Sequence, residues 1–232
     1  MNSINNQSFE FSGDALQSVG QARLAYVRKV YSFFGLGLLM AAAGTLISMN
    51  TSIVFLVAEH PIISLIVMIG AVILASASAK HPSRALPTML LFTFISGATI
   101  SPTLYAIANG YIGTGVGLIY NALFLTILIF GGLTAYVFIS KKDFSFMGAS
   151  LTVGLFMVIG VSIVNMFVES STLDLALSVI TVILFSGFVL YDTSRILKRS
   201  HEIPPTLGAL SLYLDFLNIF MALLNIMGGR RD

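Results

Sequence analysis

The chain has 232 residues, of which 56% are hydrophobic and only 9% are charged, and its formal net charge is +2. Soluble domains carry about 25% charged residues, so this composition excludes an ordinary soluble protein and indicates an integral membrane protein. There is no cysteine, which excludes disulfides and thiolate metal sites.

Seven apolar runs are long enough to cross a bilayer as helices, which requires roughly 20 residues. They are residues 30–49, 62–79, 86–108, 114–139, 146–168, 173–191 and 206–227. The runs are continuous rather than alternating, so a β-barrel is not expected. Their short connections predict one all-α transmembrane bundle over residues 23–232, and the polar composition of residues 1–22 predicts a mobile N-terminal tail.

Small residues recur at four-residue spacing on two of the runs. Ala71, Ala75 and Ala79 follow one another on the second run, and Gly113 and Gly117 lie at the start of the fourth. This spacing predicts close contacts between helices of the bundle.

The distribution of basic residues predicts the topology. Arginines and lysines lie before the first run and after the second, fourth and sixth, whereas the intervening loops contain neither. The positive-inside rule therefore places the N-terminus and the loop after the sixth run in the cytoplasm. Arg230 and Arg231 break this pattern. A full crossing by the seventh run, which is long enough to span, puts them outside, and a re-entrant segment would put them inside.

Enzyme signatures are missing from the sequence. It contains no H-E-x-x-H, G-x-S-x-G or Walker loop, and His60, His81 and His201 fall in predicted loops. We therefore expect neither enzymatic activity nor a cofactor. The basic residues form small groups between runs, which is typical of topology signals and lipid-headgroup contacts and argues against nucleic-acid binding.

Two aspartates are the leading candidates for a functional site, because ionisable groups are costly in hydrocarbon. Asp192 directly follows the sixth run, and Asp215 lies about 13 Å into the seventh at 1.5 Å per residue. Taken alone, Asp192 is also explained as a helix-end carboxylate at the interface, paired with Arg195 one turn later. Asp215 alone could make one buried hydrogen bond to a neighbouring span.

Antiparallel packing of the last two runs would bring both aspartates together. Two close carboxylates in a low dielectric tend to share a proton, so the pair predicts a proton-operated latch between two helices. Lys80, Arg84 and Arg195 are the candidate basic partners of this latch.

A polar stripe on the third run comprises Ser96, Thr99, Ser101 and Thr103. It predicts hydrogen bonds between helices, although a hydrated pathway would need the same residues.

Four segments resemble the Bax inhibitor-1 family, also called the transmembrane Bax inhibitor motif family. Residues 211–220 (SLYLDFLNIF) are similar to its seventh-helix signature and residues 190–193 (LYDT) to its sixth-helix motif. Residues 141–146 (KKDFSF) resemble its basic loop, and residues 95–97 with Pro102 resemble its third helix.

This resemblance implies a seven-helix bundle whose central seventh helix is wrapped by the other six. It also implies a pH-sensitive calcium leak in a bacterial inner membrane, with Asp192 and Asp215 as the sensor and as weak, transient Ca²⁺ ligands. Bacterial leak members carry a latch arginine near the position of Ala79 and Lys80, so here that arginine is replaced by Lys80 or displaced to Arg84.

Two other functions compete with this interpretation. Some loop and third-helix features are closer to a bacterial branch that modulates a membrane AAA protease, which implies an interaction protein of quality control with residues 2–21 as its docking element. Intramembrane aspartyl proteolysis also uses two membrane aspartates, but residues 212–215 read LYLD where Gly-x-Gly-Asp is required. Leucine and tyrosine would obstruct the water-filled site that such hydrolysis needs.

Overall fold

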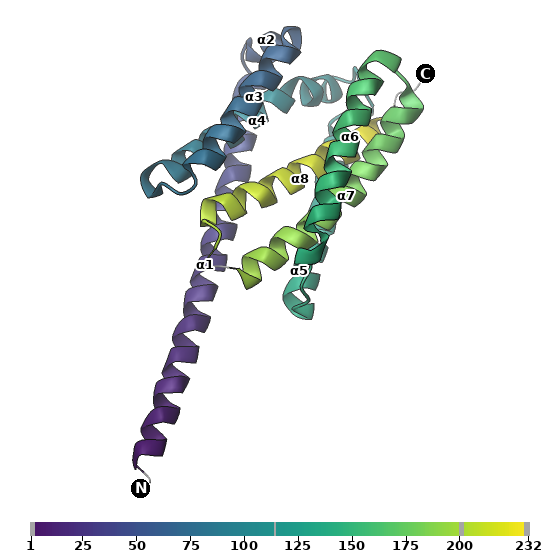
Figure 1. Cartoon of the computed structure of the whole chain (residues 1–232). Helices are drawn as coiled ribbons and strands as arrows, with labels where there is room; N and C mark the ends of the chain where they lie inside the picture. Colours follow the sequence, from purple (N-terminus) through teal and green to yellow (C-terminus); the bar gives the residue numbers. More distant parts are fainter. Residues whose placement is uncertain (1–2, 114, 200–201, 230–232) are drawn as a thin grey trace.

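The computed structural model describes residues 3–113, 115–199 and 202–229, with side chains described from residue 20 onward. Its elements in chain order are α1 (Ser3–Met49), α2 (Ile53–Glu59), α3 (Pro61–Ser78), α4 (Pro82–Ala108), α5 (Val116–Ser140), the 3-10 turn η1 (Ser145–Met147), α6 (Gly148–Val168), α7 (Ser171–Lys198) and α8 (Pro205–Gly228) (Figure 1). Seven stretches of these residues are helical, long and apolar enough to cross a membrane. The predicted all-α class and seven spans are confirmed, and the predicted seventh span is α8.

Local sequence signals account for most helix ends. Pro61, Pro82 and Pro205 occupy the first positions of α3, α4 and α8, where a missing N–H costs no helical hydrogen bond. Lys141 and Glu169 adopt left-handed conformations, with φ of 53° and 52°, and end α5 and α6.

The first helix is continuous from Ser3 to Met49, so no break separates the predicted tail from the first span. Its N-terminal part projects away from the other helices (Figure 1). The separate role predicted for residues 1–22 stays a prediction.

The sequence interpretation missed one helix and misplaced one contact. The seven-residue α2 is too short to span a membrane, and it packs against α4, where the ring centroid of Phe55 lies 5.7 Å from that of Tyr105. The close contact predicted for Gly117 is wrong, because a Cβ added there meets no described atom within 4 Å. Gly113 precedes α5 but does approach another helix, since a Cβ added there would lie 3.6 Å from the Cα atom of Gly228 in α8. The alanine face is buried as predicted, with Ala71 and Ala75 on α3, which packs against α4.

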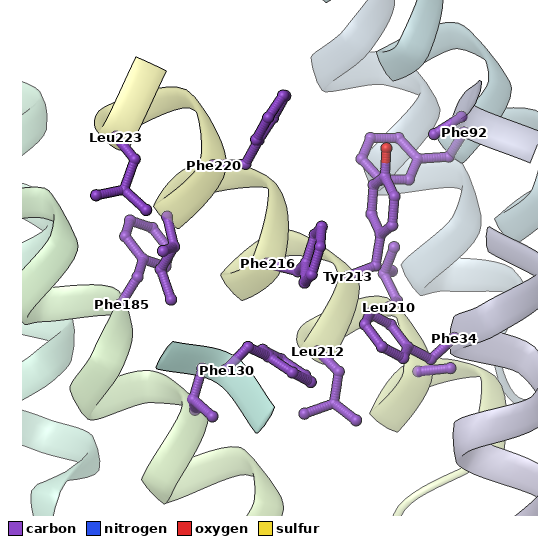
Figure 2. Close-up of a cluster of buried hydrophobic side chains, with 14 of the residues drawn as sticks. Phe34, Phe92, Phe130, Phe185, Leu210, Leu212, Tyr213, Phe216, Phe220 and Leu223 are labelled. Carbon is purple, nitrogen blue, oxygen red and sulfur yellow. The ribbon is translucent and has the colours of Figure 1, made fainter. Parts of the chain in front are cut away.

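The most buried span is α8, which packs mainly against α1, α4, α5 and α7. The outer helices α3 and α6 lie against α4 and α7. Figure 2 shows aromatic side chains from several helices around α8. Phe34, Phe130 and Phe216 form a triangle with ring centroids 5.1 to 6.0 Å apart, which joins α1, α5 and α8 by the van der Waals packing that holds membrane helices together.

Small and hydroxyl residues let α1 and α4 approach closely. A Cβ added to Gly97 would collide with the carbonyl oxygen of Ala41, and one added to Gly44 with that of Phe94. Thr45 donates a hydrogen bond of 2.9 Å to the Gly97 carbonyl across the same crossing. This crossing fixes the position of α4 against α1.

The polar stripe of α4 serves mainly to join helices. Ser101 is hydrogen-bonded to Ser48 of α1 at 2.6 Å, and Ser96 to Tyr213 of α8. Thr99 bonds to its own helix, and Thr103 lines a cavity described below. The prediction of hydrogen bonds between helices is therefore confirmed for Ser96 and Ser101.

Candidate functional site

Asp192 lies inside a helix rather than at its end. The sequence interpretation ended this span at Tyr191, but α7 continues to Lys198 because Thr193, Ser194 and Ile196 remain buried along its inner face. Lys198 in the last turn is favourable near the negative end of the helix dipole. The helix-end position predicted for Asp192 is therefore wrong, since its side chain is buried with 7% exposure, whereas the predicted pair with Arg195 is present.

Arg195 is the basic residue that contacts this aspartate. Its Nη1 donates to Oδ1 of Asp192 at 3.3 Å, and its guanidinium lies 5.1 Å from the ring centroid of Tyr191. Lys80 and Arg84 are exposed around the α3–α4 connection, and neither forms an ion pair within the described part of the chain. Of the three candidate partners, the structure brings only Arg195 to the pair.

Asp215 is buried more deeply, with 3% exposure, on the face of α8 that meets its neighbours. The extensive packing of α7 on α8 places Asp215 within electrostatic range of Asp192, and direct contact between the two carboxylates stays a prediction. The Oδ2 atom of Asp215 has no hydrogen-bond partner among the described residues. An unpartnered buried carboxylate oxygen is exceptional in a folded protein and points to a functional role.

Further polar atoms near the pair also lack hydrogen-bond partners within the described ranges. They are the hydroxyl oxygens of Tyr26, Tyr31, Thr134 and Thr193. Tyr26 lies near Arg195, and Tyr31 lies beside Thr134 and Thr193. The end of the bundle that contains the pair thus gathers several buried hydroxyl groups from α1, α5 and α7.

The loop between α5 and η1 is fastened to α7 beside the pair. Asp143 accepts hydrogen bonds from the backbone N–H of Ser145 at 2.9 Å and from its hydroxyl at 2.6 Å, and the Ser194 hydroxyl lies 3.3 Å away. Lys198 forms an ion pair with Asp143 at 3.5 Å. The bonds from Ser145, followed by the nearby Lys198 charge, lower the pKa of Asp143 to about 2.

This attachment was absent from the sequence interpretation. Asp-x-Ser is a common turn pattern, in which the carboxylate caps the N–H two residues later, so the turn itself was detectable. The contact with Ser194 joins residues far apart in sequence and carried no local signal.

A polar cavity of about 990 Å³ lies at the opposite end of the bundle, among α4, α6, α7 and α8. Asn165 donates to Asp174 at 2.5 Å and Asn225 to Ser178 at 2.7 Å within its wall. The cavity also reaches Asn218, about 4.5 Å along α8 from Asp215 at 1.5 Å per residue. A hollow entered from this end therefore extends to within one helical turn of the pair.

Metal-binding capacity in the described residues is limited. They contain no group of three or more His, Cys, Asp or Glu side chains placed to hold a metal ion. His60 and His81 flank helix starts, and His201 lies outside the described residues. Ca²⁺ takes about six to eight oxygen ligands, so two carboxylates offer only a weak site.

Comparisons with known proteins agree with the motifs found in the sequence. Residues 23–232 match the family model described as "Inhibitor of apoptosis-promoting Bax1". An uncharacterized membrane protein of Vibrio cholerae is 36% identical over 87% of this chain and 88% of its own length. Protein lifeguard 4 of Mus musculus is 33% identical over 88% of this chain and 85% of its own length. A Golgi anti-apoptotic protein of Vaccinia virus (strain Lister) is 29% identical over 94% and 91%.

Proposed function

Because the chain belongs to the Bax inhibitor-1 family of membrane proteins, we propose that it is a pH-sensitive cation leak gated by Asp192 and Asp215, with Ca²⁺ as the permeant ion. The observation that carries this proposal is the buried pair, in which one carboxylate oxygen of Asp215 has no partner among the described residues. The proposal includes no enzymatic activity and no resident cofactor. It places the protein in a bacterial inner membrane with a cytoplasmic N-terminus.

The pair acts as a latch through its proton. When a proton is shared, the carboxylates hold the cytoplasmic end of α7 against the start of α8. When the proton leaves, two like charges face each other in a low dielectric, and they repel or admit a cation. Arg195 offsets part of this charge in the closed state, and Tyr26 and Tyr31 of α1 are the titratable groups on the facing helix.

The polar cavity supplies the route to this latch from the other side. Cations entering the hollow meet Asp174 and then amide oxygens as far as Asn218. One turn of α8 separates that residue from Asp215. Weak oxygen sites suit a leak, because an ion that binds weakly also leaves.

Ca²⁺ flux into proteoliposomes, measured from about pH 5 to about pH 8, tests the proposal. The wild-type protein is expected to close at the acid end, where the pair holds its proton. Asp215→Asn and Asp192→Asn are each expected to remove most of this pH dependence. An Asp215→Asn protein with the wild-type pH profile would contradict the latch.

The alternative function, modulation of a membrane AAA protease, depends on residues 2–21 as a docking element. The side chains before residue 20 lie outside the described part of the chain. Co-purification of the protease with the full chain, and its loss when residues 2–21 are deleted, would support that function.

A further inference from the structure

A second cavity, of about 680 Å³, lies where the start of the span in α1, at residues 20–27, meets the C-terminal ends of α5 and α7. Four of its lining residues are basic: Arg23, Lys141, Lys142 and Lys198. They come from three separate segments of the sequence, and the fold brings them around one hollow. Neither the aspartate pair nor the polar cavity at the other end of the bundle includes any of them.

The charge of this basic pocket is largely uncompensated. Among the described residues, Lys198 has an ion pair, with Asp143 at 3.5 Å, whereas Arg23, Lys141 and Lys142 have none. Asp143 itself is already engaged by Ser145. Three cations around one hollow therefore attract an anionic ligand.

The remaining wall of the basic pocket is apolar. Leu24 and Phe138 line it and are 51% and 38% exposed, respectively. A free phosphate ion would neutralise the cations but leave these side chains uncovered. An amphipathic anion would satisfy both parts of the wall.

We propose that the basic pocket binds an anionic phospholipid, with its phosphate held by Arg23, Lys141 and Lys142 and its acyl chains against Leu24 and Phe138. The pocket lies at the ends of spans, where phospholipid headgroups lie, and basic pockets between helices on the cytoplasmic side suit such headgroups. The bound lipid links α1 to the C-terminal ends of α5 and α7. This site does not depend on the proposed leak.

Lipid binding to the purified full-length chain tests this site, with phosphatidylglycerol as the probe. Bound lipid is counted by native mass spectrometry, and thermal stabilisation is measured during lipid titration in a neutral detergent. The Lys141→Gln/Lys142→Gln protein is expected to bind phosphatidylglycerol at least tenfold more weakly, since each basic residue contributes about 1 kcal/mol near an anionic headgroup. Both lysines are exposed, so the substitutions leave the packed core intact.

Arg28→Gln/Lys29→Gln is the matched control, because it removes two exposed cations from α1 that do not line the pocket. The control is expected to bind phosphatidylglycerol as the wild type does, and zwitterionic phosphatidylethanolamine is expected to stabilise neither protein specifically. An equal loss of phosphatidylglycerol binding in both double variants would show a diffuse effect of surface charge and would overturn the proposed lipid site. Unchanged binding by the lysine variant, or equal stabilisation by inorganic phosphate, would overturn it as well.

Discussion

At the scale of single residues, two aspartates near the end of α7 have opposite surroundings. Asp143 lies on an exposed loop and receives two hydrogen bonds from Ser145, which lower its pKa to about 2. Asp215 is buried and has an oxygen without a partner in the described ranges. Because Asp143 stays ionised at every physiological pH, it can fasten the loop but cannot sense pH.

Asp143→Asn therefore should leave the pH profile of Ca²⁺ flux in place. The pKa of Asp143 is lowered from 3.8, so its contribution to stability is complete above about pH 4 and is lost only as the pH falls through about 2. Flux measured from about pH 5 to about pH 8 is expected to keep its wild-type midpoint. A midpoint shifted by one pH unit or more would assign Asp143 a role in sensing.

For the hydrogen bond between Ser96 and Tyr213, we expect substitution of the two partners to cost different amounts of stability. The Ser96 hydroxyl donates to the Thr93 carbonyl at 2.9 Å, so the Tyr213 hydroxyl is the donor to Ser96. Tyr213→Phe leaves Ser96 paired and should cost about 0.5–1.5 kcal/mol, whereas Ser96→Ala leaves a buried phenol unpaired and should cost about 1–3 kcal/mol. Thermal unfolding in detergent measures both, and a larger loss for Tyr213→Phe would contradict this hydrogen-bond direction.

At the scale of elements, the crossing of α1 and α4 depends on residues without side-chain bulk. Gly44 and Gly97 let the backbones approach so closely that a methyl group at either position meets a carbonyl oxygen of the other helix. The hydrogen bond from Thr45 to Gly97 requires the same proximity. Because α4 in turn supports α2 and α3, this crossing organises one side of the bundle.

Gly97→Ala should destabilise the protein by about 1–3 kcal/mol, because neither backbone can move aside without repacking. Gly132→Ala in α5 is the control, since its added methyl meets no described atom within 4 Å and alanine favours helix by up to about 1 kcal/mol. The melting temperature in detergent is expected to fall only for Gly97→Ala. An equal fall in melting temperature in both proteins would show that the close crossing of α1 and α4 is not the cause of the destabilisation.

At the scale of the whole molecule, two hollows lie at opposite ends of a bundle centred on α8. The polar cavity ends near Asn218, and the basic pocket lies beside α1, α5 and α7. The aspartate pair lies between their levels, on α7 and α8. This arrangement gives each side of the membrane its own chemistry.

Single cysteines test this arrangement directly, because the chain has no cysteine of its own. A membrane-impermeant thiol reagent is expected to label Asn225→Cys in the polar cavity from outside and Lys142→Cys in the basic pocket from the cytoplasm. Ile183→Cys, which replaces a side chain that is 69% exposed on the apolar part of α7, should be labelled from neither side. Labelling of positions 225 and 142 from the same side would refute the proposed orientation.

The sequence by itself determined the membrane class and the seven spans, and it singled out the two aspartates of the proposed latch. These properties are local and additive, since a run of apolar residues spans a bilayer whatever its neighbours are. The prolines that start α3, α4 and α8 act locally as well. Only the tertiary structure decided that Asp192 is buried inside α7, that Arg195 rather than Lys80 or Arg84 contacts it, and that Asp215 has an unpaired oxygen in the described residues. Those features depend on which faces of distant helices meet, and hydropathy along a chain does not encode that geometry.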